Sequence, residues 1–387
     1  MSAPLAGLLV LDLAQFLSGP SAALRLADLG ARVIKVERPG TGDICRTLYL
    51  TDTEVAGDST LFHAINRNKE SVALDLKDAR DLAALKGLIA RADVLIQNFR
   101  PGVIERLGLG YEAARSLNPR LVYASVSGYG EAGPWTHMPG QDLLAQSLSG
   151  ITWLNGHEGE GPVPLGLSIA DILAGHVLTE GILAALVQRG VTGAGARVET
   201  SLLEALIDLQ FEMLTTYLND GQRLPQRAGY RNSNAYLAAP YGIYPTADGY
   251  LALAMMPLAQ LAATLPSPAL LAYDERDAFT RRDEIKRVIA ADLLRHPTGY
   301  WLARLAPADV WCAEVLDWPR LIESDAFRRL GMLQTVGREV GAAVHTTRGP
   351  LRIDGRRAGG AGGAGGSRAA PRVGEHSVSV LREFGLR

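Results

Sequence analysis

Cysteine is nearly absent from this sequence of 387 residues, which contains only Cys45 and Cys312. The two lie far apart in the chain, and neither has a second cysteine or a histidine near it at metal-ligand spacing. This pattern disfavours a disulfide framework and is typical of a protein from a reducing compartment. We therefore expect a cytoplasmic protein that binds no metal.

An excess of charge of one sign is also absent. The chain has 39 Lys and Arg residues against 41 Asp and Glu residues, a net charge of −2. Nucleic-acid-binding proteins concentrate basic residues, so no nucleic-acid partner is expected. The opening residues MSAPLAGLLVLDLAQ have no basic segment and carry Asp12 in their apolar run, so they predict a strand and not a signal peptide. Because the longest apolar runs fall short of a membrane span, no membrane association is expected.

A glycine-rich dinucleotide fingerprint is missing after the first predicted strand, which argues against a dinucleotide site of the usual kind. The 47% hydrophobic content nevertheless supports large cores. Strands and helices alternate along the first half of the chain, which predicts an α/β fold with a Rossmann-like, doubly wound and mostly parallel sheet. The predicted strands are 7–13, 32–37, 93–97 and 121–127, and the predicted helices are 19–29 and 78–91.

The second half of the chain predicts a smaller α+β domain. The residues AAPYGIYPTADGYLALA, 238–254, contain two strand-forming runs around an Ala-Asp-Gly turn, which indicates a hairpin. We expect a large domain over 1–205, a helical linker over 206–224, the small domain over 225–325 and a return to the large domain over 326–387. Further predicted elements are long helices at 172–189 and 198–219, helices at 276–293 and 298–306, a glycine-rich surface loop at 359–366, and a terminal helix that begins near Gly374.

Two predicted strands end in the same tripeptide. Strand 32–37 continues into Arg38-Pro39-Gly40, and strand 93–97 continues through Asn98 and Phe99 into Arg100-Pro101-Gly102. Ligands bind at the carboxyl ends of strands in open α/β sheets, and the arginine fork matches phosphate oxygens. With Arg106 one turn further, the pattern predicts a phosphate-bearing ligand, although either turn alone could be an ordinary strand exit.

Asp171 is the most informative single residue. The sequence GLSIADILAG, 166–175, leads from an apolar run into Asp171 and then into a helical pattern. A carboxylate at or near a helix N-terminus is stabilised by exposed N–H groups and by the helix dipole. Asp171 is therefore either a helix N-cap or a reactive carboxylate.

Several ordered motifs together resemble a known family. They include PLAGLLVLDLAQFLSGP, ADLGARVIKVERPGTGD, ADVLIQNFRPGVIERLGLGYE, NPRLVYASVSGYGEAGP and APRVGEHSVSVLREFGL. Along nearly the whole chain the sequence is similar to the family III CoA-transferases, also called the CaiB/BaiF family. The resemblance implies a Rossmann-like large domain, a small domain and two chains interlocked in a homodimer.

The resemblance also implies functional residues. Asp171 matches the aspartate that acts as nucleophile, with coenzyme A as a co-substrate, a small carboxylic acid as acceptor and no resident cofactor or metal. The matching coenzyme A contacts are Leu17, Ser18, Arg38, Leu74, Lys77, Asn98, Phe99, Arg100, Arg106 and Gln141. Formyl-CoA transferases carry a glutamine at the position of Leu17, and its absence here disfavours oxalate and formate as substrates.

Two other functions remain open from the sequence. The α-methylacyl-CoA racemases resemble this chain as well, and a fold alone does not decide function. Racemases pair the aspartate with a histidine that matches Gln141 and use a glutamate that matches Met256, and both departures favour transfer. The other alternative is a coenzyme A-binding protein without catalysis, which the retention of Asp171 beside the arginines disfavours.

Overall fold

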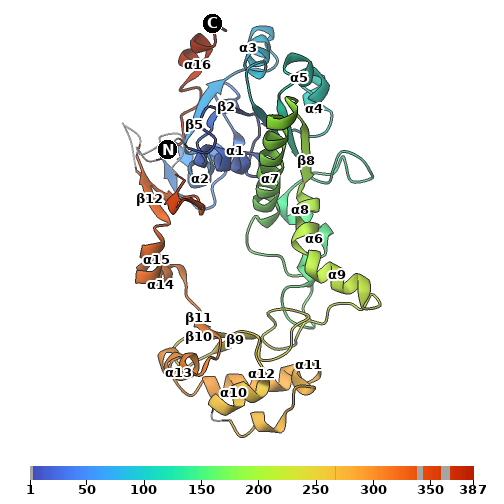
Figure 1. The fold of residues 1–387 in the computed structure, drawn as a ribbon, viewed down its shortest axis with the longest axis vertical. Coiled ribbons are helices and arrows are strands. Elements are labelled where there is room, and N and C mark those ends of the chain that lie inside the picture. Colours follow the sequence, from blue (N-terminus) through green and yellow to red (C-terminus); the bar gives the residue numbers. More distant parts are fainter. Residues whose placement is uncertain (1–2, 266, 338–342, 359–366) are drawn as a thin grey trace. The chain divides into compact units, whose positions relative to one another are not determined.

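The computed structural model describes residues 3–265, 267–337, 343–358 and 367–387 (Figure 1). The chain forms two compact units: the first comprises Met1–Ala145, Ser168–Asp208 and Arg329–Arg387, and the second Gln146–Leu167 and Leu209–Arg328. The division expected from the sequence differs mainly in 146–167. This segment groups with the second unit because its backbone is bonded there: Asn232 Nδ2 donates to the carbonyl oxygen of Gly156 at 2.9 Å, and the Glu158 N–H donates to that of Ala228 at 3.1 Å.

A six-stranded parallel sheet organises the first unit. Its strand order is β5-β2-β1-β6-β7-β8, and every neighbouring pair is parallel. The order reverses between β1 and β6, so their carboxyl ends flank the crevice in which ligands bind to such sheets. The predicted parallel sheet is therefore confirmed. The strands are β1 (Leu9–Asp12), β2 (Arg32–Glu37), β5 (Lys69–Ala73), β6 (Val94–Gln97), β7 (Val122–Ser127) and β8 (Arg197–Ser201).

One predicted helix is wrong at its start. The long helix expected over 198–219 is the edge strand β8 followed by two helices, α8 (Leu202–Leu209) and α9 (Phe211–Asn219). The strand sequence Arg-Val-Glu-Thr-Ser has one apolar residue and runs directly into a helical pattern, so periodicity did not separate them. The segment is a strand because it pairs with β7, in a register that starts with Tyr123 opposite Arg197.

Helices cover both faces of the sheet. Leu11, Ile34 and Leu95 point to one face and share a core with helices of that side, while α1 and α7 pack on the other. This is the doubly wound arrangement that the alternating pattern predicted. The helices on the first face are α3 (Ala79–Ile89), α4 (Val103–Arg106), α5 (Tyr111–Leu117) and α16 (Ser377–Glu383), and those on the second are α1 (Ser18–Asp28) and α7 (Ile169–Thr192).

Helix α7 is unusually long and apolar. Its 24 residues would by length and composition suffice to cross a membrane, and it is the one such helix in the described part of the chain. The helix packs against α1, β7 and β8 of the first unit. Its buried residues include Ala174, Leu178 and Ile182, so it acts as a core helix there.

The second unit contains a small antiparallel sheet of order β11-β10-β9, which confirms the hairpin expected over 238–254. Tyr244, Leu251 and Trp301 are buried in its core. The strands are β9 (Gly242–Pro245), β10 (Tyr250–Leu253) and β11 (Cys312–Glu314). The helices of its later part are α10 (Leu258–Thr264), α11 (Asp277–Thr280), α12 (Arg282–Leu293), α13 (Thr298–Leu305) and α14 (Trp318–Glu323).

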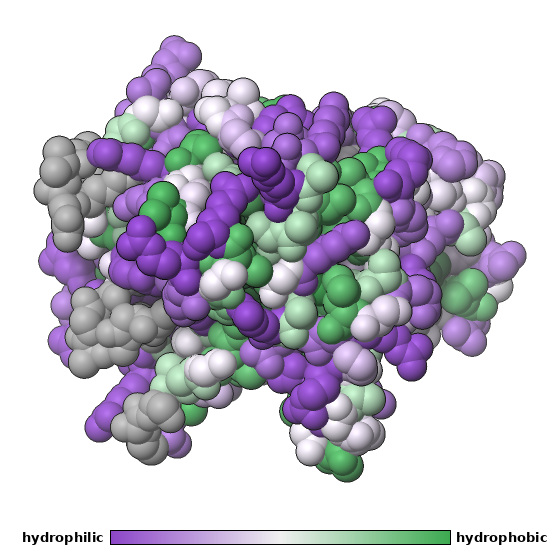
Figure 2. Space-filling model, turned by 90° about the horizontal axis from the view of Figure 1, so that it is seen from above, coloured by the Kyte–Doolittle hydropathy of each residue, from purple (hydrophilic) through white to green (hydrophobic). Residues whose placement is uncertain are grey.

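The remaining elements are short. They are β3 (Glu54–Val55), β4 (Asp58–Ser59), α2 (Thr60–Asn66), α6 (Asp142–Ser149), α15 (Asp325–Leu330), β12 (Leu333–Val336), β13 (Val344–Thr347), β14 (Arg352–Ile353) and β15 (Arg356–Arg357). The predicted glycine-rich loop at 359–366 lies outside the described residues. On the face drawn in Figure 2, hydrophilic and apolar residues are interspersed.

Candidate active site

Asp171 is the third residue of α7 and lies where this helix meets the start of α1. The N-cap of α7 is Ser168, so the alternative that Asp171 is the N-cap is wrong. The Asp171 carboxylate instead accepts hydrogen bonds from the backbone N–H and the hydroxyl of Ser18, the first residue of α1. It therefore lies at the positive end of the α1 dipole, where Leu17 provides no side-chain cap.

A glycine one turn beyond Asp171 allows this meeting of helices. A Cβ atom on Gly175 would lie 2.1 Å from the Ser21 hydroxyl oxygen and 2.7 Å from the Ser18 carbonyl oxygen. Any larger residue at 175 would push α7 away from α1, because both contacts are far below van der Waals distance. Gly175, the last residue of the GLSIADILAG motif, thus allows Asp171 to come within reach of Ser18.

A second carboxylate lies beside Asp171. The Asp142 Oδ1 atom accepts the N–H of Ala170 at 2.7 Å and that of Asp171 at 3.4 Å. Burial and the nearby Asp142 charge together raise the pKa of Asp171 from its ordinary value of 3.8 to about 6, against the opposing hydrogen bonds from Ser18. A carboxyl group with this pKa is mostly ionised at neutral pH, so it can act as a nucleophile without a separate base.

A cavity of about 620 Å³ lies against Asp171 at the carboxyl edge of the sheet. Its walls come from the loops that follow β1, β6 and β7 and from the segment before α6. The predicted site residues that line it together with Asp171 are Ser18, Asn98, Phe99, Arg100 and Gln141.

A neighbouring cavity of about 220 Å³ brings together the other predicted contacts at the ends of β2 and β5. Arg38, Leu74 and Lys77 line it, and Phe99 lines both cavities. Among the described residues neither Arg38 nor Lys77 has an ion-pair partner. These two exposed cations are therefore available for an anionic ligand, and the cavities at the sheet crevice are adjacent.

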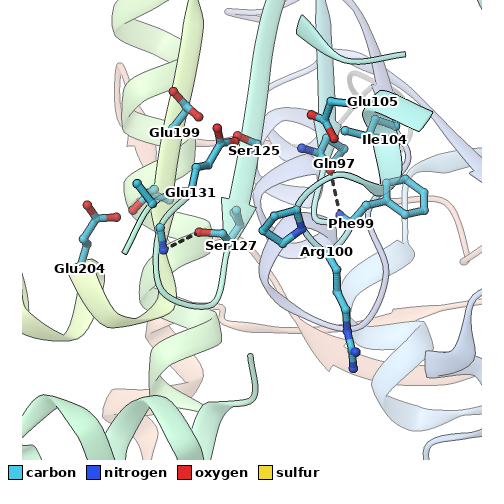
Figure 3. A pocket seen from close by; sticks show the side chains of 15 residues that line it. Gln97, Phe99, Arg100, Ile104, Glu105, Ser125, Ser127, Glu131, Glu199 and Glu204 are labelled. Atoms are coloured by element: carbon cyan, nitrogen blue, oxygen red, sulfur yellow. Dashed lines mark hydrogen bonds between the residues drawn. The ribbon is translucent and has the colours of Figure 1, made fainter. Parts of the chain in front are cut away.

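A third cavity, of about 270 Å³, has the opposite electrostatic character. Its lining includes Glu105, Glu131, Glu199 and Glu204 (Figure 3). Burial and the nearby Glu131 carboxyl raise the pKa of Glu199. A phosphate would meet carboxylates here, so an anionic ligand is favoured on the Arg38 side of the Asn98–Pro101 loop.

The loop between β1 and α1 forms one wall of the Asp171 cavity. The Gln15 N–H donates to Asn98 Oδ1 at 2.9 Å, and Asn98 Nδ2 donates to the Gln15 carbonyl oxygen at 2.8 Å. Phe16 has a φ of +62°, a left-handed conformation that costs a bulky residue on the order of 1–3 kcal/mol. Sequence reasoning missed Phe16, since an aromatic residue in a loop carries no signal of its backbone conformation.

Two of the predicted coenzyme A contacts, Leu17 and Arg106, do not line either the Asp171 cavity or the Arg38 cavity. Leu17 packs against a buried cluster that contains Cys45 and Phe62. Arg106 is the exposed last residue of α4, with its guanidinium near Gly102. The part of the chain that the structure describes also contains no group of three or more His, Cys, Asp or Glu residues placed to hold a metal ion.

Comparison with known proteins identifies the family. The model of CoA-transferase family III matches residues 5–377. An acetyl-CoA:oxalate CoA-transferase from Acetobacter aceti is 35% identical over 81% of this chain and 81% of its own length. A succinate–glutarate CoA-transferase from Agrobacterium fabrum is 31% identical over 98% of this chain and 96% of its own.

Solved structures agree with this assignment. A CaiB/BaiF family protein from Brucella suis superposes with a TM-score of 0.86 at 28% identity and covers 99% of this chain and 100% of its own. A protein from Mycobacterium tuberculosis superposes with a TM-score of 0.81 at 28% identity, covering 97% of this chain and 99% of its own. The chain belongs to CoA-transferase family III and is an enzyme of that family.

Proposed function

We propose that this enzyme moves coenzyme A from an acyl-CoA donor to a carboxylic acid acceptor through covalent intermediates on Asp171. The observation that carries the proposal is a half-buried carboxylate in a cavity, bonded by the first N–H of α1, with its pKa raised to about 6. The carboxylate is ionised at neutral pH yet poorly solvated, which favours attack on a carbonyl carbon.

The reaction needs only one nucleophile from the protein. An Asp171 oxygen attacks the thioester carbonyl carbon, the carbon–sulfur bond breaks, and the thiolate of coenzyme A leaves an aspartyl–acyl anhydride. The thiolate attacks the aspartyl carbonyl carbon, which releases the donor acid and forms an aspartyl-CoA thioester. An acceptor carboxylate repeats these two steps in reverse. The Ser18 donors, fixed by the helix, are suited to stabilise negative charge that develops near Asp171.

The two cavities along the sheet crevice suit the two ends of coenzyme A. Arg38 and Lys77 supply positive charge for the phosphates, and Phe99 lies between that cavity and the one at Asp171. Binding energy from the nucleotide end can then orient the thioester at Asp171, and exclusion of water protects the anhydride from hydrolysis. Arg100 and Arg106 complete the proposed set of phosphate contacts.

Transfer accounts for the site better than racemisation does. Racemisation exchanges a proton on two faces of the α-carbon and therefore needs two groups with usable pKa values. Gln141, which lines the cavity at Asp171, cannot exchange a proton at neutral pH. His137 is exposed and is not among the side chains that line this cavity.

The proposed acids are small, and the related enzymes suggest dicarboxylates. The names of relatives include oxalate, succinate, glutarate and mesaconate as CoA acceptors or donors. Leu17 stands where the resembling formyl-CoA transferases carry glutamine, which argues against oxalate. Oxalate nevertheless belongs in the test because the Acetobacter relative is 35% identical.

We further propose an interlocked homodimer in the cytoplasm, with no nucleic-acid or membrane partner. The exposed apolar residues of α7 support a partner surface: Val187 is 73% and Val191 is 87% exposed, one turn apart on a helix that is apolar on most sides. Because interlocked chains separate only on unfolding, sedimentation at nanomolar concentration should show no folded 41.3 kDa monomer. A folded monomer would contradict the dimer.

One experiment separates the three functions. The enzyme is incubated in deuterated water with a chiral 2-methylacyl-CoA or with succinyl-CoA, together with a panel of isotopically labelled mono- and dicarboxylates. The proposal predicts coenzyme A on the labelled acids and no α-deuteration. Deuteration with loss of optical activity and without transfer would identify a racemase, and binding of coenzyme A without either reaction would identify a non-catalytic protein.

A further inference from the structure

We infer that Lys35 is a positioning residue for the reaction: from beneath the β1–α1 loop it fixes the backbone that presents Ser18 to Asp171. The inference rests on the proposed nucleophilic role of Asp171. Lys35 lies on β2 and is 0% exposed, so it touches neither the cavity nor any ligand in it.

The loop that Lys35 supports has little freedom to move without changing the site. Ser18 directly follows this loop, and its N–H and hydroxyl are the donors to the Asp171 carboxylate. Two residues earlier, Phe16 adopts its left-handed φ of +62°, which a bulky side chain keeps only if the surroundings impose it. A relaxed loop would therefore move the Ser18 donors relative to Asp171.

Lys35 holds the backbone of this loop at two points. Its ammonium donates to the carbonyl oxygen of Ala14 at 2.8 Å and pairs with Asp43 Oδ2 at 2.8 Å. The other oxygen of Asp43 accepts the N–H of Phe16 at 3.2 Å and that of Cys45 at 2.9 Å. One buried cation thus fixes Ala14 directly and Phe16 through Asp43.

The local charges explain why a lysine is required at this position. Asp12 lies 3.8 Å from the Lys35 ammonium and pairs with Lys69 at 2.8 Å, and the Lys69 ammonium also donates to the Pro20 carbonyl oxygen in α1. Two cations and two carboxylates therefore balance beneath the loop. Loss of Lys35 alone would leave Asp43 buried and uncompensated, which strongly destabilises a fold.

The test removes both charges of the pair at once. In the Lys35→Met/Asp43→Asn variant no buried charge is left unpaired, and the amide that replaces the Asp43 carboxylate keeps the size of the side chain. The matched control is Arg67→Met/Asp28→Asn, a buried ion pair at the other end of α1 whose Nη2–Oδ2 distance is 2.5 Å. Both variants lose one buried pair, but only the first touches the loop.

We expect kcat for transfer to fall about ten- to a hundredfold in the Lys35/Asp43 variant, because small misplacements of reacting groups have effects of this size. KM for acyl-CoA should change less than about threefold, since Arg38 and Lys77 keep their places. The acidic limb of the rate profile should shift to higher pH, because the Ser18 bonds lower the pKa of Asp171 and are lost. Asp142, the charged neighbour of Asp171, is the same in every variant.

The Arg67/Asp28 control variant should keep the wild-type kcat and the wild-type position of the acidic limb. An unchanged limb in the folded Lys35/Asp43 variant, or an equal shift in the control, would overturn the inference. If the double variant does not fold, Asp43→Asn alone tests the Lys35–Asp43 link, and a smaller shift of the acidic limb in the same direction is expected, because Lys35 keeps its bond to Ala14 and still faces Asp12. If wild-type enzyme shows no transfer, the proposed function fails. The inference about Lys35 is then tested by a ¹³C-carboxyl NMR titration of Asp171 in wild-type enzyme and in the Lys35/Asp43 variant. The Asp171 signal is assigned by its loss in Asp171→Asn.

Discussion

Asp142 and Asp171 share the N-terminus of α7: the Oδ1 atom of Asp142 accepts the N–H of Asp171 at 3.4 Å and that of Ala170 at 2.7 Å. Asp142 thereby satisfies N–H groups that Ser168 leaves uncapped. The same carboxylate raises the pKa of Asp171 by its charge. A single residue thus stabilises the helix that carries the proposed nucleophile and adjusts the nucleophile's ionisation.

Replacement of Asp142 by asparagine should separate these two effects. The amide oxygen of Asp142→Asn can still accept the Ala170 N–H, but the negative charge is gone, so the pKa of Asp171 should fall below about 6. We expect the acidic limb of kcat/KM to move to lower pH while the melting temperature changes little. Asp142→Ala, the control, should also lose the cap and about 1 kcal/mol of stability. A limb that moves upward or stays fixed in Asp142→Asn would contradict this electrostatic coupling.

Asp171 should reduce stability at neutral pH. Its pKa in the folded protein, about 6, lies above the ordinary 3.8, so ionisation favours unfolding. The cost is fully present above pH 6 and disappears as the pH falls through 6 toward 3.8. Asp171→Asn should therefore raise the free energy of unfolding at pH 8 by up to about 2–3 kcal/mol.

This advantage of Asp171→Asn should vanish near pH 4. Denaturant unfolding of both proteins across this pH range measures the difference. An asparagine variant that is less stable than wild type at pH 8, or equally stabilised at both pH values, would show that the carboxylate carries no such cost.

Arg38 and Lys77 should contribute to coenzyme A binding rather than to chemistry. Charge-assisted bonds contribute about 1.5–3 kcal/mol each, so Arg38→Ala should raise KM for acyl-CoA about ten- to a hundredfold with little change in kcat. Lys77→Ala should act in the same direction. Arg115→Ala, in which an exposed arginine of α5 is removed, is the control and should leave KM unchanged. Unaltered affinity for coenzyme A in both the Arg38 and Lys77 variants would place the nucleotide elsewhere.

Much of the sheet and part of the site could be predicted because their signals are local. Strand 32–37 was predicted with the observed bounds of β2, since it is rich in valine and isoleucine and is followed closely by proline and glycine. The two Arg-Pro-Gly turns pointed to the sheet edge where the cavities lie, because parallel strands end at the same edge. Asp171 was found through its helical context and the family resemblance.

The rest depends on contacts that are distant in sequence. Strand β8 exists through its pairing with β7, and its own residues do not show a strand period. Lys35 and Asp43 are eight positions apart with the Arg38 turn between them, so nothing local indicates that they form a buried pair. The left-handed conformation of Phe16 is likewise imposed by its partners. Residues that touch a ligand follow strand ends, whereas residues that support them are specified only by the folded structure.

Mass spectrometry of the intermediate on Asp171 tests the central claim most directly. Wild-type enzyme is incubated with acyl-CoA without acceptor, trapped with hydroxylamine and digested, with Asp171→Asn as the control. The account predicts a hydroxamate in the peptide that contains Asp171 and none in the asparagine variant, which should also lose transfer while it still binds coenzyme A. A modified residue other than Asp171, or full transfer activity in Asp171→Ala, would contradict the account.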